Sequence, residues 1–263
     1  LSDSAIPLGK LGLPQKQKVY YFDTQQYTRY FDPHLKANFL FGDVRHTPEE
    51  PAIVKSRPLD GDNANSIVLK LDKLRHFNFI TDTRAFRDKK DMLLGRGVVK
   101  REHRVRFFEM YFDHPMCNLG QVNRDRNEHW VRDFLTIEEH LDYKFILCLE
   151  GNDVATNLKW VMSSNSLPVM PRPKFETWYM EGTLIPNHHY VEIRSDYSDL
   201  EERLNFYISH PEEAERIIQN AHAYVEQFRN PEQEKLISLL VLEKLFYRTG
   251  QCDSDHKALF DHP

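Results

Sequence analysis

The chain has few cysteines and no long apolar run, and both absences narrow its class. There are 3 cysteines among 263 residues, namely Cys117, Cys148 and Cys252, and their odd number and wide spacing fit neither a disulfide framework nor a zinc motif. We therefore expect a reducing, cytoplasmic compartment, with Cys148 as a small core residue. No run of about 18 apolar residues occurs, so no membrane-spanning helix is expected.

Signals for export, repetition and bulk nucleic-acid binding are missing as well. The opening Leu1-Ser2-Asp3-Ser4 has no signal-peptide pattern and looks like the start of a trimmed chain. The net charge of -5 and the pI of about 6.2 disfavour binding to bulk nucleic acid, although local basic clusters can still hold a small anion. The 40% hydrophobic content is enough for one large domain or two small ones.

The most informative segment that is present covers residues 143–170. The apolar run 145–149 predicts a strand that ends in Glu150-Gly151-Asn152-Asp153, a helix is predicted over 154–162, and the apolar run 167–170 predicts a second strand. This order is typical of a βαβ unit. A turn from a strand into a helix presents backbone N–H groups and a positive dipole end, so we expect a phosphate-like ligand there.

Other elements are predicted from periodicity and capping residues. Segment 66–74 fits a helix or a strand. Strands are predicted at 18–22, 38–41, 53–54, 92–94 and 190–193, and helices at 102–112, 136–141, 198–208 (with Ser198 as N-cap), 211–228 and 231–247. Strands and helices alternate after residue 85, which indicates an α/β fold with a mainly parallel sheet. Glycine turns at Gly95-Arg96-Gly97 and Glu150-Gly151 are expected at the carboxyl ends of two strands, where such sheets bind ligands.

Several short motifs of the C-terminal half resemble those of the family 90 glycosyltransferases, in particular their bacterial lipopolysaccharide-modifying branch. More distantly, the chain is similar to eukaryotic protein O-glucosyltransferases and fungal capsule-associated xylosyltransferases. The resemblance covers roughly residues 39–248. The matching motifs occur in the family's order: Leu94-Gly95-Arg96-Gly97, Arg104, Tyr143-Lys144-Phe145 through Gly151, Lys159, Ser166-Leu167, Glu176-Thr177-Trp178-Tyr179, His189-Tyr190-Val191 and Asp199-Leu200.

The resemblance implies a GT-B-like architecture, with two facing Rossmann-like domains of which the N-terminal one is reduced. We expect an N-terminal acceptor-side domain at 1–85, a C-terminal domain that binds the nucleotide sugar at 86–250, and a loose tail at 251–263. The implied activity is inverting transfer of a hexose from a UDP-sugar, with UDP-glucose as the expected donor, to a lipopolysaccharide or lipooligosaccharide core. No metal or other cofactor is expected. The implied place is the cytoplasm, with possible peripheral association with the inner membrane.

The resemblance assigns the donor site mainly to the C-terminal domain. Arg104 and Arg96 are expected to hold the diphosphate because guanidinium groups match phosphate geometry, although both can also be part of an ordinary basic helix start. Glu150 is expected to bind sugar hydroxyls or to pair with Lys144. The expected donor-binding residues are Arg96, Gly97, Arg104, Glu150, Gly151, Asn152, Asp153, Val154, Ala155, Asn157, Lys159 and Glu176.

Two departures from the eukaryotic relatives affect this site. Asn157 stands where they carry an arginine, so Lys159 or Arg57 is expected to supply the missing cation. Val98 replaces a serine hydroxyl.

The catalytic base is expected in the N-terminal part. Aligning the segment 41–48 with the family's Asn-Val-Arg-Asp-Tyr-Pro turn places either Asp43 or His46 at the aspartate, and we favour Asp43 because it follows an apolar strand at a glycine turn. Its alternative role is to cap that turn. Four nearby residues are expected to contact the acceptor or a phosphate, namely Lys55, Ser56, Arg57 and Asn63.

Two other functions compete with this one. Asp60-Gly61-Asp62 has the form of the metal-binding triplet of GT-A transferases, but its polar surroundings favour a solvated loop. Asn157 and Val98 also permit a protein that binds nucleotides or carbohydrates without turnover.

Overall fold

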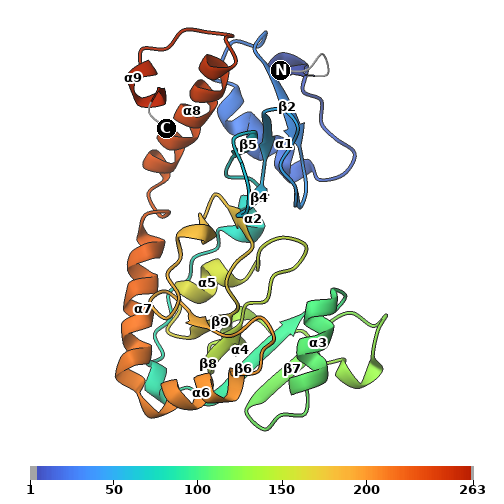
Figure 1. The fold of residues 1–263 in the computed structure, drawn as a ribbon, viewed down its shortest axis with the longest axis vertical. Helices are drawn as coiled ribbons and strands as arrows, with labels where there is room; N and C mark the ends of the chain where they lie inside the picture. The colour runs from blue at the N-terminus through green and yellow to red at the C-terminus, as the bar shows by residue number, and fades with distance from the viewer. Residues whose placement is uncertain (1–4, 262–263) are drawn as a thin grey trace. The chain divides into compact units, whose positions relative to one another are not determined.

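The computed structural model describes residues 5–261 and divides into two compact units (Figure 1). The first unit takes in the chain up to Arg75, Lys174–Gly182 and the chain from Phe228 on, and the second takes in His76–Pro173 and Thr183–Gln227. Segments 174–182 and 228–250, which the sequence assigned to the C-terminal domain, thus belong to the first unit. The opening residues 1–4 lie outside the described part.

The second unit is built on a sheet of five parallel strands. The strands are β6 (Lys90–Gly97), β7 (Cys117–Gln121), β8 (Tyr143–Leu147), β9 (Leu167–Met170) and β11 (Val191–Glu192). Their order across the sheet is β11-β9-β8-β6-β7, and every pair is parallel. The chain goes from β6 outward to β7 and then returns past β6 to β8, so the direction of winding reverses between β6 and β8. This confirms the expected α/β class with a parallel sheet.

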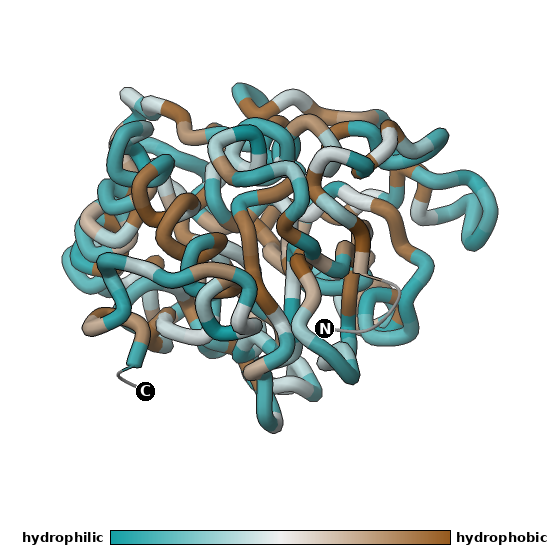
Figure 2. The backbone as a smooth tube through the Cα atoms, turned by 90° about the horizontal axis from the view of Figure 1, so that it is seen from above, coloured by the Kyte–Doolittle hydropathy of each residue, from teal (hydrophilic) through white to brown (hydrophobic). Residues whose placement is uncertain are grey.

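Helices supply the rest of the second unit. They are η2 (Phe86–Asp88), α3 (Glu102–Tyr111), η3 (Glu128–Trp130), α4 (Ile137–His140), α5 (Leu158–Met162), α6 (Leu200–Ser209) and α7 (Pro211–Glu226). Phe107 of α3, Phe145 of β8 and Ile217 of α7 belong to one buried apolar cluster. Figure 2 shows the hydrophobic stretches running through the interior and mainly hydrophilic loops outside.

The first unit has a smaller sheet. β1 (Ile6–Pro7) runs antiparallel to β2 (Lys36–Leu40), and β3 (Ala52–Val54) and β5 (Ser66–Val68) continue parallel to β2. A separate antiparallel pair joins β4 (Ser56–Pro58) to β10 (Phe175–Thr177). The helices here, with those at the unit boundaries, are η1 (Leu8–Lys10), α1 (Lys18–Thr28), α2 (Lys73–His76), η4 (Glu181–Thr183), α8 (Pro231–Arg248) and α9 (Lys257–Phe260).

Segment 18–22 is not the expected strand, since it begins the helix α1. Its Val-Tyr-Tyr-Phe run has strand-like composition, but Tyr20, Asp23, Thr24 and Tyr27 are buried at helical spacing. That period of three to four residues becomes visible only over a window longer than five residues.

Three boundaries also differ from expectation. Gly95-Arg96-Gly97 is not a turn but the end of β6, because β7, which the sequence did not predict, pairs with it. Helix α5 begins at Leu158, so 151–157 is loop. Ser198 does not cap α6; its hydroxyl donates to Asp196 instead. Cys148 is fully buried, as predicted.

Among residues 5–261, the structure contains no helix with the length and apolar character needed to span a bilayer.

Candidate functional site

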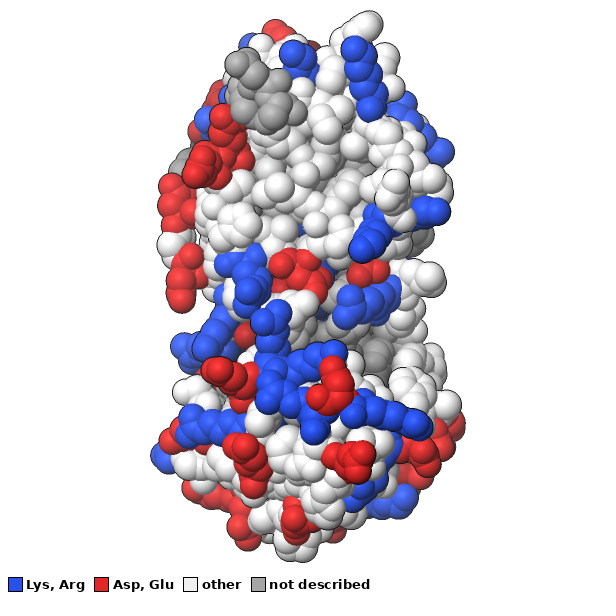
Figure 3. Space-filling view, turned by 90° about the vertical axis from the view of Figure 1, so that its right-hand side faces the viewer, with Lys and Arg blue, Asp and Glu red and all other residues white. Residues whose placement is uncertain are grey.

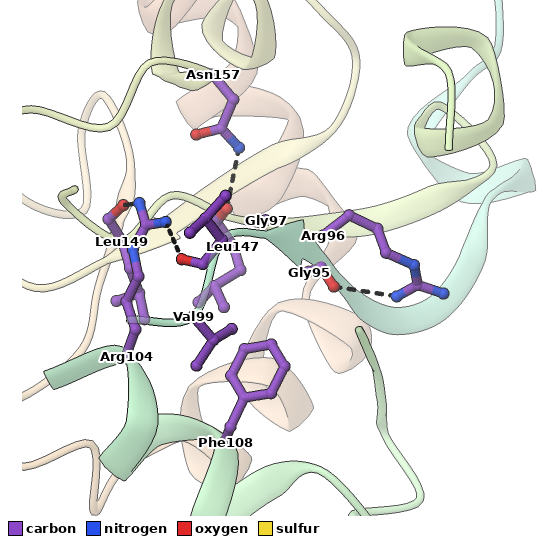
Figure 4. A pocket seen from close by; sticks show the side chains of 10 residues that line it. Gly95, Arg96, Gly97, Val99, Arg104, Phe108, Leu147, Leu149 and Asn157 are labelled. Carbon is purple, nitrogen blue, oxygen red and sulfur yellow. Dashed lines mark hydrogen bonds between the residues drawn. The ribbon is translucent and has the colours of Figure 1, made fainter. Parts of the chain in front are cut away.

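A pocket opens in the second unit where the carboxyl ends of β6 and β8 meet (Figure 4). Its empty volume, open solvent included, is about 370 Å³. The lining residues come from the ends of both strands, from α3 and from the loop before α5: Gly95, Arg96, Gly97, Val98, Val99, Arg104, Phe108, Leu147, Leu149 and Asn157. The pocket thus lies at the point where the winding reverses, which is the usual ligand position in a doubly wound sheet.

Arg104, in the first turn of α3, joins the two strand ends. Its Nε donates to the carbonyl oxygen of Glu150 (2.8 Å), Nη1 to that of Val98 (2.9 Å) and Nη2 to that of Leu149 (2.7 Å). These carbonyls are neutral, so they orient the guanidinium without cancelling its formal charge. The three contacts therefore fix the guanidinium at the pocket, and its predicted contact with a diphosphate stays a prediction.

Two glycines leave room beside this guanidinium. A Cβ at Gly97 would lie 3.5 Å from Nη1 of Arg104, and a Cβ at Gly151 would lie 3.6 Å from Nη2. Any side chain longer than alanine at either position would extend into the space next to the cation. Both glycines were among the expected donor-binding residues, and the structure places both against Arg104.

Arg96 lines the pocket but extends away from Arg104 in Figure 4. Its Nη1 donates to the carbonyl oxygens of Gly95 and Asn118 (2.8 Å to Asn118), and its Nη2 donates to the side-chain oxygen of Asn118 (2.7 Å). The side-chain amide of Asn118 in turn donates to the hydroxyl of Tyr143. Burial lowers the pKa of Arg96. Its buried Nε has no hydrogen-bond partner. Asn118 is on β7, a strand that was not predicted, so this contact could not be expected from the sequence.

The loop after β8 is attached to the start of α3. Arg101 donates to the side-chain oxygen of Asn152, and Nε2 of His103 lies 2.8 Å from the carbonyl oxygen of Glu150. Lys144 does not pair with Glu150 as the sequence allowed; its ammonium contacts Asp91. These contacts hold the loop at the pocket edge.

The remaining expected donor residues of this unit are less accessible. Asn157 turns its amide to the carbonyl oxygen of Leu147 (3.0 Å). Asp153, Val154 and Ala155 are buried, and Lys159 is fully buried in α5. Lys159 is therefore not at the surface of the pocket and is not among the residues that line it.

Basic side chains gather on the second unit. The segment between β6 and the end of α3 contains Lys100, Arg101, Arg104 and Arg106. Figure 3 shows Lys and Arg side chains in a band across the lower half of the face drawn. A local basic surface thus exists on a chain whose net charge is -5.

In the first unit, Asp43 follows β2 and contacts Lys55. Nζ of Lys55 lies 2.5 Å from Oδ1 of Asp43. Ser56, which is fully buried, donates to the carbonyl oxygen of Val44 (3.0 Å). His46 is exposed. Lys55 and Ser56, which were expected to contact the acceptor or a phosphate, are both buried.

Arg57 and Glu176 pair with each other on the β4–β10 ribbon. They are partners in its register, and Nε and Nη2 of Arg57 lie 2.8 and 2.7 Å from Oε1 of Glu176. The structure thus pairs Glu176 with Arg57 in the first unit, and the predicted contact of Glu176 with the donor stays a prediction. Asn63 bonds to Thr47 (3.1 Å) and to the carbonyl oxygen of Pro58 (2.6 Å).

The Asp60-Gly61-Asp62 triplet is an exposed loop. Asp62 accepts a hydrogen bond from the N–H of Ala64 (2.9 Å), as in an ordinary Asx turn. Within residues 5–261, no group of three or more His, Cys, Asp and Glu side chains is arranged to hold a metal ion.

Comparison with known sequences decides the family. The sequence model of glycosyl transferase family 90 matches residues 86–233, which is more than half of the chain and includes the whole β6–β8 pocket. The chain belongs to glycosyl transferase family 90. It is therefore a glycosyltransferase.

One relative has a name that agrees with this assignment. A protein of Dichelobacter nodosus named O-glucosyltransferase LpsA is 46% identical over 233 residues, which cover 88% of this chain and 73% of the relative. Two uncharacterised viral proteins match shorter stretches. Protein 027R of Frog virus 3 is 30% identical over 46% of this chain and 13% of its own length, and protein 179R of Invertebrate iridescent virus 6 is 28% identical over 44% and 10%.

Proposed function

We propose that this glycosyltransferase moves a hexose, with glucose as the first choice, from a UDP-sugar to a lipopolysaccharide or lipooligosaccharide core acceptor. The position of Arg104 at the β6–β8 pocket carries the proposal, because a fixed guanidinium at the switch point of a parallel sheet suits a diphosphate. The relative named O-glucosyltransferase LpsA supports glucose and a lipopolysaccharide-type acceptor.

The proposed reaction inverts the anomeric carbon. The Asp43 carboxylate takes the proton of the acceptor hydroxyl while that oxygen forms a bond to the anomeric carbon. The bond from that carbon to the diphosphate breaks, and the leaving diphosphate carries away the electron pair. Arg104 and main-chain N–H groups of 151–157 stabilise the charge that develops on it.

We further propose a GT-B arrangement, in which the second unit binds the donor and the first unit supplies the base and the acceptor side. The all-parallel sheet of the second unit and the parallel strands β2, β3 and β5 of the first support this proposal. No metal is required in the proposed reaction, because Arg104 takes the role that a bridging cation has in GT-A enzymes. The proposed place of action is the cytoplasm, with peripheral association with the inner membrane.

The decisive experiment compares donors. Purified protein is screened by thermal shift against UDP-glucose, UDP-galactose, UDP-xylose and UDP-N-acetylhexosamines, and UDP release is then measured with and without EDTA. We expect the largest shift and EDTA-resistant turnover with UDP-glucose. Binding without turnover would favour a carbohydrate- or nucleotide-binding protein, and turnover that needs Mn²⁺ would favour the Asp60/Asp62 reaction.

A further inference from the structure

We infer that Lys55 is a positioning residue for the reaction, one that holds Asp43 ionised and in a single orientation without itself contacting the substrate. The inference rests on the proposed role of Asp43 as the base. It assigns to Lys55 a task different from the acceptor or phosphate contact that the sequence suggested.

The burial of Lys55 argues against direct contact between its side chain and the substrate. Its side chain is 1% exposed, whereas that of Asp43 is 24% exposed. A buried ammonium is costly unless a negative group compensates it, and the Asp43 carboxylate lies 2.5 Å away. The accessible member of the pair is thus the carboxylate, and the ammonium stands behind it.

Strand geometry explains why the two residues meet. β2 and β3 are parallel neighbours, with Leu40 opposite Val54 in the register. Lys55 directly follows β3, and Asp43 follows β2 after a short turn, so both lie at the same edge of the sheet. Parallel strands bring their carboxyl ends together.

The turn that carries Asp43 is fixed on both sides. On one side, Gly42 has φ +114°, a conformation in which any residue with a side chain would be strained. On the other side, Ser56 holds the carbonyl oxygen of Val44. Lys55 and Ser56 therefore act together, one on the carboxylate and one on the main chain.

Other charges surround the pair. Asp72 is 7% exposed, and burial raises its pKa. The positive charges of Arg75 and Lys55 act in the opposite direction, while the carboxylates of Asp23 and Asp43 add to the increase. Asp72 and Asp43 repel each other and Lys55 attracts both, so loss of the Lys55 ammonium would leave two neighbouring carboxylates with less compensating charge.

The test is the pH profile of kcat/KM, which reports the ionisation of groups in the free enzyme. Lys55→Met removes the charge and keeps an unbranched side chain. We expect the acid limb of the profile to move upward by about 1–3 pH units, the range typical of losing an opposite charge at this distance. Lys55→Arg keeps the charge, so its acid limb should stay near that of the parent.

Lys70→Met is the matched control. Lys70 is also a buried lysine of the first unit, and its Nζ lies 2.5 Å from Oε2 of Glu234. Its loss should lower the melting temperature without moving the acid limb. An equal shift in both lysine variants would overturn the inference, because it would reflect general loss of structure.

A double-mutant cycle separates the inference from the proposed function. If Lys55 acts through Asp43, then Lys55→Met added to Asp43→Asn should change turnover less than twofold, although it lowers turnover in the parent. Full activity of Asp43→Asn would refute the base itself. Loss of activity in Asp43→Asn, together with an unshifted acid limb in Lys55→Met, would refute only the role of Lys55.

Discussion

The hydrogen bonds described above give three cations of the first unit and the two arginines of the β6–β8 pocket different kinds of partner. In the first unit, Lys55, Arg57 and Lys70 each contact a carboxylate, on Asp43, Glu176 and Glu234 respectively. In the second unit, the hydrogen bonds described for Arg96 and Arg104 go to carbonyl and amide oxygens, which carry no formal charge.

The difference matters for ligand binding. A carboxylate partner fixes a cation and offsets its charge, whereas a carbonyl partner fixes it and leaves the charge in place. Because the described bonds hold the Arg104 guanidinium at the lining of the β6–β8 pocket, they support the proposed donor site there. In the first unit, the pairing instead organises a carboxylate, which suits the removal of a proton.

The strongest test of the proposal that the first unit supplies the base and the second binds the donor is Asp43→Asn. We expect turnover to fall by about 10²–10⁴-fold, the usual contribution of a general base, while UDP affinity stays nearly unchanged because the donor site is assigned to the second unit. Single-turnover kinetics and calorimetry with UDP measure the two effects. His46→Ala is the control and should do much less; the reverse pattern would identify His46 as the base.

The next largest effect is expected for Arg104→Ala. Loss of a charge-assisted contact to the diphosphate should weaken UDP binding by about 1.5–3 kcal/mol. Calorimetry measures the affinity, and a melting curve reports how far the loss of three main-chain contacts disturbs the unit. Arg104→Lys restores the charge without the forked geometry of the guanidinium. Its UDP affinity should therefore lie between that of the parent and that of Arg104→Ala. An unchanged UDP affinity in Arg104→Ala would remove the basis for placing the donor here.

A smaller and different effect is expected for Glu176→Gln. The change removes the charge that Arg57 contacts, so the free energy of unfolding should fall by about 1–3 kcal/mol, while UDP affinity should not change. Denaturant titration and calorimetry on the same sample test both parts. A clear loss of UDP affinity with normal stability would instead show that Glu176 binds the donor, as the sequence predicted.

The smallest effect is expected on removing divalent metal. Turnover should persist in EDTA, and the paired variant Asp60→Asn/Asp62→Asn should match the parent, since Asp62 caps an exposed turn. Complete loss of turnover in EDTA with recovery in Mn²⁺ would contradict the proposed reaction.

The sequence was a good guide where periodic runs are long. Helices α7 and α8 begin at Pro211 and Pro231 as predicted, because proline and acidic residues mark their first turns. The strand–helix–strand order of segment 143–170 was also predicted, although its helix begins at Leu158 and not at residue 154, since its apolar runs are bounded by glycine and polar residues. The pocket between β6 and β8 was expected from the same reasoning.

Contacts between distant segments could not be predicted from the sequence. β7 is short and contains Asn118 and Gly120, so no apolar run in the sequence indicates a strand there. Because β7 was not predicted, the end of β6 that pairs with it was predicted as a turn. The pairing of Arg57 with Glu176 depends on a ribbon between segments 119 residues apart. Local patterns identify which residues are charged, but the partner of each charge is set by topology.

The division of the chain has a consequence for its synthesis. Residues 76–173 and 183–227 complete the second unit, so its sheet can close while the ribosome is still adding residues. The first unit, although it begins the sequence, lacks β10 and α8 until much later, and α8 brings Glu234 to Lys70. Until β10 and α8 are made, the nascent N-terminal segment therefore has its four-stranded sheet but lacks the β4–β10 ribbon and the partner of Lys70. Loss of α8 would damage the start of the protein more than its middle.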